Sequence, residues 1–554
     1  MARARARGPG RVVPGLTVVV LLASLLLGAC APNRAYRSQL LDLGADQRCE
    51  RGGAAPMPEP CAHVSPEAVK DLYELHFVEF DDQGWLFPDA PANPEASAAA
   101  STASATAAEA LSFGPSQQID RVMMRLRALL DDGKDLSIVV FVHGWKHNAQ
   151  ADDANVQEFR DLLEAAGAEE RDRTLPGGTA RRVVGIYVAW RGKSWTIPDP
   201  VLSLTFWARK EAARRVSVGS SRELFARLRS LRTHYNETVV VAPASAPGQG
   251  AGGNARPVVA LRARAAEQTG ASSEQGPQRP RIRMLMIGHS FGGLILYAAM
   301  SGSLIESLTA QRDLAGLGVD GELAERPADM ILLINPAFEA SRYESLYRVS
   351  NGYAPSRFQP PLLVSVTSIK DWATGIAFPI GRSVNTLFER ETTPEQGTAM
   401  KKTPGHIEQY LTHRLHAHVP AASGASGSSG EPAPADPSGG RCPGWKSEAE
   451  LKALHGSELG QAVRRNKQLE ADNTAAFFRE NLAPSHLLRP DWTRTFCGGS
   501  YLTMARSGGD ARQANALVWN IQVDGDVIRN HDDVMNPVFR AFMRQLYTDV
   551  STHP

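Results

Sequence analysis

A serine flanked by glycines is the residue of this chain best placed to act as a nucleophile. Residues 288–292, Gly-His-Ser-Phe-Gly, fit the pattern Gly-x-Ser-x-Gly, with Ser290 at its centre. The apolar run 283–287 before it indicates a buried strand, and apolar residues at helical spacing follow it. A serine on a sharp strand-to-helix turn projects its hydroxyl into a site, and the glycines leave room where strand and helix cross. The alternative is a glycine-rich turn whose serine only caps the helix.

A serine hydroxyl needs two partners before it can attack a substrate. A base must remove its proton, and a carboxylate must orient that base. Loops at the carboxyl ends of parallel strands are where such groups meet, and Asp371 follows the apolar run 361–367 by a few residues. We therefore expect Asp371 to be the acid, with Glu339, just after the run 330–335, as the alternative. An aspartate at this position also fits a helix N-cap.

Histidine is the expected base, and three histidines are candidates. His531 follows the last apolar run, 517–523, and precedes a final amphipathic helix, so we predict it to be the base. The alternatives are His406 and His413, which both precede a Ser/Gly/Pro-rich segment that would hold a base loosely. The chain has 14 histidines, so most of them must have other roles.

A serine nucleophile also needs N–H groups that stabilise the negative oxygen of its reaction intermediate. One donor should be the backbone N–H of Phe291, directly after the serine. The other should come from the loop after the strand 136–142, where His-Gly-Trp stands at 143–145. Gly144 would permit a close approach, and the N–H of Trp145 would donate. The alternative is a simple turn that ends the strand.

The segments that carry these residues alternate between strands and helices. Apolar runs predict strands at 136–142, 182–190, 283–287, 330–335, 361–367 and 517–523, and helical spacing predicts helices at 119–130, 157–166, within 198–232, after Ser290 and at 536–546. Residues 72–87 alternate around an Asp-Asp-Gln-Gly turn, which predicts a β-hairpin. This order predicts an α/β fold with a mostly parallel sheet covered by helices on both faces.

Composition narrows the class of protein. The chain has 554 residues with 43% hydrophobic content, which is enough for a sizeable core. Its net charge of +1 gives no reason to expect a nucleic-acid partner. The sequence has no internal repeat at the periods of solenoids or propellers.

The N-terminus reads as an export signal. Arginines precede the apolar run 16–27, which is too short to span a bilayer comfortably. The run ends in Leu-Gly-Ala-Cys, which resembles the lipobox of bacterial lipoproteins and implies cleavage before Cys30 and lipidation of that residue. The absence of an aspartate after Cys30 implies, by the same resemblance, the outer membrane of the cell envelope, facing the periplasm. An ordinary signal peptide or an uncleaved anchor is the alternative.

The remaining four cysteines are even in number. An exported protein meets an oxidising compartment, so disulfides are plausible. Four cysteines allow three pairings, and we prefer Cys49 with Cys61 and Cys442 with Cys497 because each pair is close in sequence. No Cys-x-x-Cys or Cys/His metal spacing is present, so we expect no metal site and no cofactor.

Taken together, these motifs resemble those of the α/β-hydrolase superfamily, of the bacterial serine esterase or lipase type. The resemblance rests on Phe-Val-His-Gly-Trp at 141–145, Gly-His-Ser-Phe-Gly-Gly at 288–293 and Asp-Trp-Ala-Thr at 371–374. It covers about residues 116–390 and 510–550. In that family the chain order is serine, acid, histidine.

The resemblance implies a triad of Ser290, Asp371 and His531, with Trp145 and Phe291 as oxyanion donors. This chain departs from the pattern in its long separation between serine and histidine, where residues 391–510 form an insertion of unknown role. The segments expected are a signal peptide (1–29), a tether with disulfide loop, hairpin and flexible linker (30–115), the first part of the core (116–390), the insertion with a flexible linker (391–510) and the last part of the core (511–554).

The expected function is that of a serine hydrolase that cleaves small carboxylic esters or lipids through an acyl-enzyme, while a lipid holds it to the membrane. Two alternatives stay open. One is a non-catalytic envelope lipoprotein on a hydrolase fold, and the other is an acyltransferase or peptidase with the same triad. A superfold does not fix a substrate.

Overall fold

The structure is a computed structural model, and it describes most of the chain. The described residues are 35–36, 69–87, 117–150, 152–172, 180–193, 205–236, 281–316, 326–351, 359–386, 389–417, 442–480, 492–507, 510–511, 516–534 and 536–552. The predicted signal peptide with Cys30, the predicted pair of Cys49 and Cys61, and the segments 89–110, 242–280 and 420–441 lie outside these residues.

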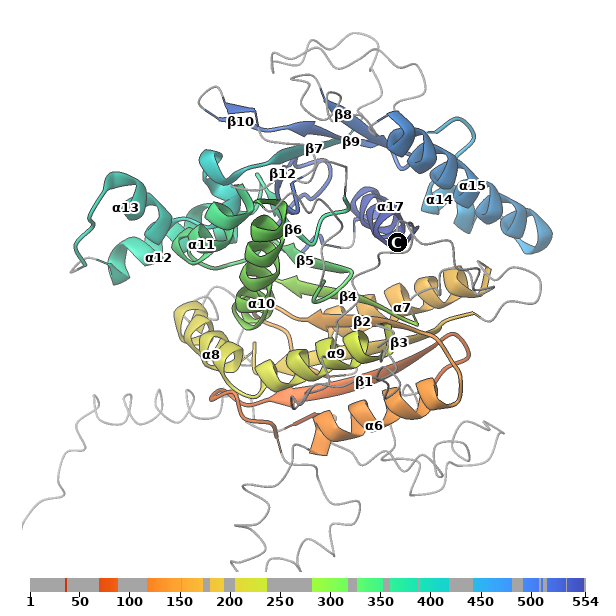
Figure 1. The fold of residues 1–554 in the computed structure, drawn as a ribbon, viewed down its shortest axis with the longest axis horizontal. Coiled ribbons are helices and arrows are strands. Elements are labelled where there is room, and N and C mark those ends of the chain that lie inside the picture. Colours follow the sequence, from red (N-terminus) through yellow and green to blue (C-terminus); the bar gives the residue numbers. More distant parts are fainter. Residues whose placement is uncertain are drawn as a thin grey trace, which may run out of the picture.

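One ten-stranded sheet organises the described part of the chain, in the order β1-β3-β2-β4-β5-β6-β12-β7-β9-β8 (Figure 1). The strands are β1 (Tyr73–Phe80), β2 (Leu136–Val142), β3 (Arg182–Trp190), β4 (Ile282–His289), β5 (Met330–Ile334), β6 (Leu363–Ser368), β7 (His413–Ala417), β8 (Thr493–Phe496), β9 (Ser500–Met504) and β12 (Val518–Val523). Pairing is parallel from β1 through β7 and antiparallel at β9 and β8. A short ribbon of β10 (Arg506–Ser507) and β11 (Asp510–Ala511) stands apart from this sheet.

Helices cover both faces of the sheet. The longer ones are α6 (Gln117–Asp131), α7 (Ala154–Asp172), α8 (Phe206–Val218), α9 (Ser221–Asn236), α10 (Phe291–Gly316), α11 (Ala340–Asn351), α12 (Phe378–Asn385), α13 (Pro394–Lys401), α15 (Gly456–Glu480) and α17 (Pro537–Thr552). One core cluster joins the sheet to α6 and α8 to α11, and a second joins its other face to α7, α15 and α17. The predicted α/β architecture, with a mostly parallel sheet between helical layers, is confirmed.

The predicted hairpin at 72–87 is wrong in its pairing. β1 pairs in parallel with β3 over its whole length, and after the turn at 81–84 a single antiparallel bridge joins Phe80 and Leu86. Almost every residue of β1 is buried. Burial on both faces is typical of a strand in a sheet covered by helices, even at its edge, rather than of an isolated two-stranded hairpin.

The segment 391–510, expected as an insertion, extends the same sheet. It supplies β7, which pairs with β12, and then β9 and β8. The predicted disulfide between Cys442 and Cys497 is present. It ties the turn between β8 and β9 to the start of the helical pair α14 (Glu448–Lys452) and α15.

Candidate active site

The strand order creates a switch point between β2 and β4. The chain leaves β2 for β3 on one side of it, and it leaves β4 for β5 on the other side. Loops diverge at such a point, and the crevice at the carboxyl ends of the strands is where α/β proteins place their sites. The loop after β2 and the serine after β4 meet here, because a Cβ added to Gly144 would lie 2.9 Å from Cβ of Ser290.

Ser290 stands on a strained turn between β4 and α10. Its φ is +54°, a left-handed conformation that ordinarily costs a non-glycine residue about 1–2 kcal/mol. Backbone contacts hold it there: its N–H donates to the carbonyl of Ile334, and its carbonyl accepts from the N–H of Ala337. A Cβ on Gly292 would lie 2.0 Å from the carbonyl oxygen of Val142, so only glycine fits beside the serine.

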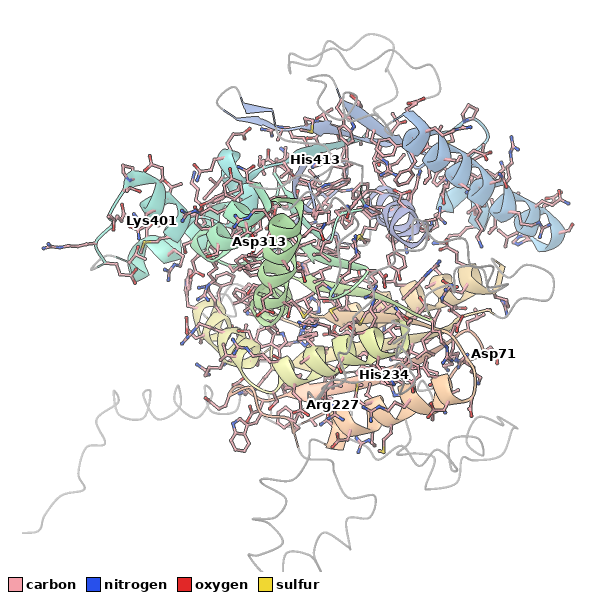
Figure 2. All side chains as sticks on the ribbon, viewed as in Figure 1. Asp71, Arg227, His234, Asp313, Lys401 and His413 are labelled. Carbon is pink, nitrogen blue, oxygen red and sulfur yellow. A yellow bond between two sulfur atoms is a disulfide. The ribbon has the colours of Figure 1, made fainter. Side chains whose placement is uncertain are left out.

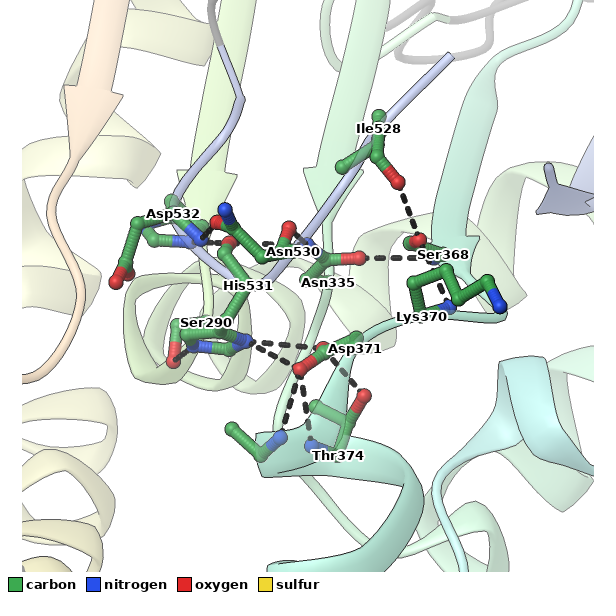
Figure 3. Close-up of polar contacts among 12 residues, drawn as sticks. Ser290, Asn335, Ser368, Lys370, Asp371, Thr374, Ile528, Asn530, His531 and Asp532 are labelled. Atoms are coloured by element: carbon green, nitrogen blue, oxygen red, sulfur yellow. Dashed lines mark hydrogen bonds and ion pairs between the residues drawn. The ribbon is translucent and has the colours of Figure 1, made fainter. Parts of the chain in front are cut away.

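A continuous hydrogen-bonded chain runs from this serine to a carboxylate (Figure 3). Oγ of Ser290 lies 2.8 Å from Nε2 of His531, and Nδ1 of His531 lies 2.9 Å from each carboxylate oxygen of Asp371. The network assigns the proton of the neutral ring to Nδ1, since Asp371 accepts there. Nε2 is then free to accept the proton of the serine hydroxyl.

Asp371 is buried and held as an anion. The backbone N–H groups of Ala373 and Thr374 donate to it at 2.9 and 3.2 Å, and the hydroxyl of Thr374 donates to its other oxygen. Burial alone would raise the pKa of this carboxyl, but the charge of His531 and these hydrogen bonds outweigh it and lower the pKa.

The pKa of His531 shifts in the opposite direction, upward. Burial alone would lower the pKa of its ring, but the adjacent Asp371 outweighs that effect and raises the pKa above its ordinary value of 6.5. A base with a raised pKa takes a proton from serine more readily, at the cost of being protonated at mildly acidic pH.

Two side chains that sequence reasoning did not assign hold the loop of His531. Nε2–H of His289 and the side-chain amide of Asn335 both donate to the backbone carbonyl of His531 at 3.0 Å. Asn335 has a φ of +45° and accepts from the N–H of Ser368 at 2.9 Å. The sequence held only a weak signal for Asn335: it directly follows a strand, and asparagine tolerates a left-handed backbone.

The alternative acid, Glu339, is occupied elsewhere. It pairs with Lys210, which is buried, and with Arg342 and Arg382 at 3.0 and 3.2 Å. Despite burial, which acts to raise it, these cations lower the pKa of Glu339 to about 2. Glu339 therefore joins helices beside the site and does not orient the histidine.

The alternative bases do not reach Ser290. His413 lies on β7 (Figure 2). It is fully buried against the ring of Trp519, and burial lowers its pKa to about 3. His406 lies closer, with Nε2–H donating to the hydroxyl of Thr374 at 3.1 Å. It is thus linked to Asp371 through the hydroxyl of Thr374.

The loop after β2 is fixed by a buried histidine. Nε2 of His143 accepts from the backbone N–H of Trp190 at 3.1 Å, and its Nδ1–H donates to the carbonyl of Gly144 at 2.8 Å. The indole N–H of Trp190 in turn donates to the carbonyl of His143 at 2.8 Å. Burial lowers the pKa of His143 to about 4, so its ring is neutral and holds the loop through these hydrogen bonds.

The two predicted oxyanion donors belong to the residue after Ser290 and to the loop whose Gly144 lies against Ser290. Phe291 is the first residue of α10, so its N–H has no acceptor inside the helix and lies at the positive end of the helix dipole. Trp145 is anchored by its side chain, whose indole N–H donates to Thr205 at 3.3 Å and whose ring packs edge-on against Phe206. This leaves the backbone of the 143–145 turn beside Ser290.

Among the described residues, one group has the spacing to hold a metal ion. His289, His531 and Asp532 offer ligand atoms within 4.8 Å of one another. Both ring nitrogens of His531 are already hydrogen-bonded, to Ser290 and to Asp371, and a metal ion there would compete with the serine. We therefore assign no metal role to this group.

Comparisons of the chain with models of protein families, with curated proteins and with solved structures found no match. The chain's own geometry is therefore what bears on its function. That geometry is an α/β fold with a large, mostly parallel mixed sheet and a Ser-His-Asp chain at its switch point.

Proposed function

We propose that this chain is a serine hydrolase of the α/β-hydrolase type that cleaves carboxylic esters. The observation that carries the proposal is the hydrogen-bonded chain of Ser290, His531 and Asp371 at the carboxyl ends of β4, β6 and β12. The strained serine, the glycines that its turn requires and the neighbouring loop after β2 support the same function.

In the proposed reaction, Oγ of Ser290 attacks the ester carbonyl carbon while His531 takes the hydroxyl proton on Nε2. The oxyanion that forms accepts hydrogen bonds from the N–H groups of Phe291 and Trp145. The carbon–oxygen bond to the alcohol then breaks, and His531 returns its proton to the departing alcohol. Water, deprotonated by His531, cleaves the acyl-enzyme, which releases the acid and restores Ser290. Asp371 stays ionised and stabilises the protonated ring.

A fluorophosphonate probe tests this proposal most directly. Such a probe phosphonylates an activated serine, so it should label the folded wild-type chain and leave Ser290→Ala unlabelled. Peptide mapping of the adduct checks the position. A folded chain that the probe does not label would favour a non-catalytic envelope protein on the same fold.

Activity should fall on the acidic side as His531 becomes protonated. The ring accepts the proton only when it is neutral, and its pKa is raised above 6.5. We therefore expect kcat/KM for a soluble ester to rise with pH through an apparent pKa above 6.5 and then to level off. A pH series with a neutral ester measures this, and full activity well below pH 6 would contradict the assigned base.

We further propose that the chain is a lipoprotein of the bacterial envelope, anchored through Cys30. Cys30→Ser should block lipidation and leave a precursor that keeps its signal peptide, because the cysteine is both the cleavage-site residue and the lipid acceptor. Mass spectrometry of the membrane fraction distinguishes the two forms. Mature wild-type protein released in soluble form would contradict the anchor.

A further inference from the structure

Large apolar side chains are exposed beside the acid of the site. Among the described residues, Ile369, Trp372, Ile376 and Ile380 have exposed fractions of 49%, 64%, 50% and 63%. They make up most of the large apolar side chains that the described part of the chain exposes to this degree. Large apolar side chains that gather on a solvent-exposed face mark an interaction surface.

The spacing of these residues explains how they reach solvent together. A π-helical turn, η2 (Ala373–Ala377), runs directly into α12, so residues four apart lie on one face. Trp372, Ile376 and Ile380 form the outer face, while Thr374 and Phe378 are buried. We call this outer face, together with Ile369, the apolar stripe.

A further exposed apolar side chain, that of Trp85, lies beyond the other end of α8. α8 starts against α12, since a Cβ on Gly381 would meet the ring of Trp207, and it ends against the turn after β1, where Gly219 contacts Gly84. Trp85, directly after that glycine, is 60% exposed. Figure 1 shows α8 and α12 on one side of the molecule.

The apolar stripe has no exposed acidic side chain, so it is an uncharged or weakly basic surface. Residues 369–382 contain a single carboxylate, Asp371, which is buried. Lys370 is exposed beside the stripe, and Arg382 at its end pairs with Glu339. A tryptophan and isoleucines on one face without acidic groups are typical of segments that lie in the headgroup region of a bilayer.

The position of Tyr36 indicates what would cover the apolar stripe, namely the membrane that a lipid on Cys30 would enter. The backbone N–H of Tyr36 donates to the carboxylate of Glu79 at 2.8 Å, and Glu79 is the last residue but one of β1. Tyr36 therefore sits at the carboxyl edge of the sheet. It is six residues from Cys30, which at full extension spans at most about 20 Å. A lipid on Cys30 would hold this edge next to the bilayer.

We propose that the carboxyl edge of the sheet rests on the lipid bilayer, with the apolar stripe and Trp85 inserted at its surface. The site then opens toward the membrane, and its substrates are esters that reside in that surface. This deepens and rests on the proposed serine hydrolase function, and the orientation rests on the proposed lipid anchor.

Fluorescent probes on single cysteines test the contact without relying on catalysis. Ile376→Cys and Ile380→Cys are placed in the full-length chain that also carries Ser290→Ala, and a thiol-reactive fluorophore is attached. Met124→Cys is the matched control, because Met124 is 61% exposed but lies on α6, on a face of the sheet. The chain without an added cysteine gives the background from its native cysteines.

The labelled chains are placed in phosphatidylcholine vesicles whose acyl chains carry bromine, which quenches nearby fluorophores. We expect strong quenching at positions 376 and 380 and little at 124. Equal quenching at all three positions, or none at 376 and 380, overturns the proposal. Shielding of 376 and 380 from iodide in the absence of vesicles also overturns it, since a protein segment or a second copy would then cover the stripe. These outcomes do not depend on whether the wild-type chain hydrolyses esters.

Discussion

Ser290→Ala is expected to abolish ester hydrolysis while the protein stays folded. The hydroxyl is the only group on the strained turn that can form the acyl-enzyme, and loss of such a nucleophile typically lowers kcat on the order of a millionfold. Steady-state kinetics with a p-nitrophenyl ester measure the loss.

The thermal stability of Ser290→Ala is the control that separates loss of the nucleophile from loss of the fold. Alanine keeps the Cβ of serine, and the backbone contacts of residue 290 with Ile334 and Ala337 do not involve the side chain. The thermal unfolding midpoint should therefore stay near that of the wild type. Retention of wild-type activity in the folded variant would refute the nucleophile.

His531→Ala is expected to be about as damaging as Ser290→Ala, and the double variant should be little worse than either one. Oγ of Ser290 lies 2.8 Å from Nε2 of His531. As the proposed nucleophile and base the two would act as one unit, so removal of either would leave the other without a function. The kcat values of the wild type, the two single variants and the double variant form a double-mutant cycle that measures this coupling. Independent, additive losses would mean that His531 is not the base for Ser290.

Two other histidines serve as controls for that cycle. His406→Ala should keep most of the activity, because His406 is linked to Asp371 through the hydroxyl of Thr374. His413→Ala should also keep most of the activity per folded molecule, although it leaves a cavity beside Trp519 and should lower the unfolding midpoint. A collapse of activity in either folded variant would reopen the assignment of the base.

The sequence predicted best what local chemistry controls. The turn at Ser290 is recognisable because its two glycines and its serine stand within five consecutive residues between a strand and a helix. Asp371 and His531 could be chosen because each follows a strand in a parallel sheet. The structure brings these three residues together. The pairing of Cys442 with Cys497 also followed from sequence distance.

What the sequence did not reveal depends on distant pairing. β1 looked like half of a hairpin because its true partner, β3, lies about a hundred residues further on in the chain. β7 to β9 are short, and only their place beside β12 makes them part of the sheet. The contacts of His289 and Asn335 with the loop of His531 likewise join residues about two hundred positions apart.

The place of β12 in the sheet has a consequence for biosynthesis. β12 is the last strand in sequence order among the described residues, yet it lies between β6 and β7. Until the ribosome has made residues 518–523, both of those neighbours present unpaired edges, which favour misassociation. The sheet therefore cannot become continuous between β6 and β7 before residues 518–523 have been made. Products that end before β12 would lack His531 and sheet continuity together, so we expect them to be insoluble.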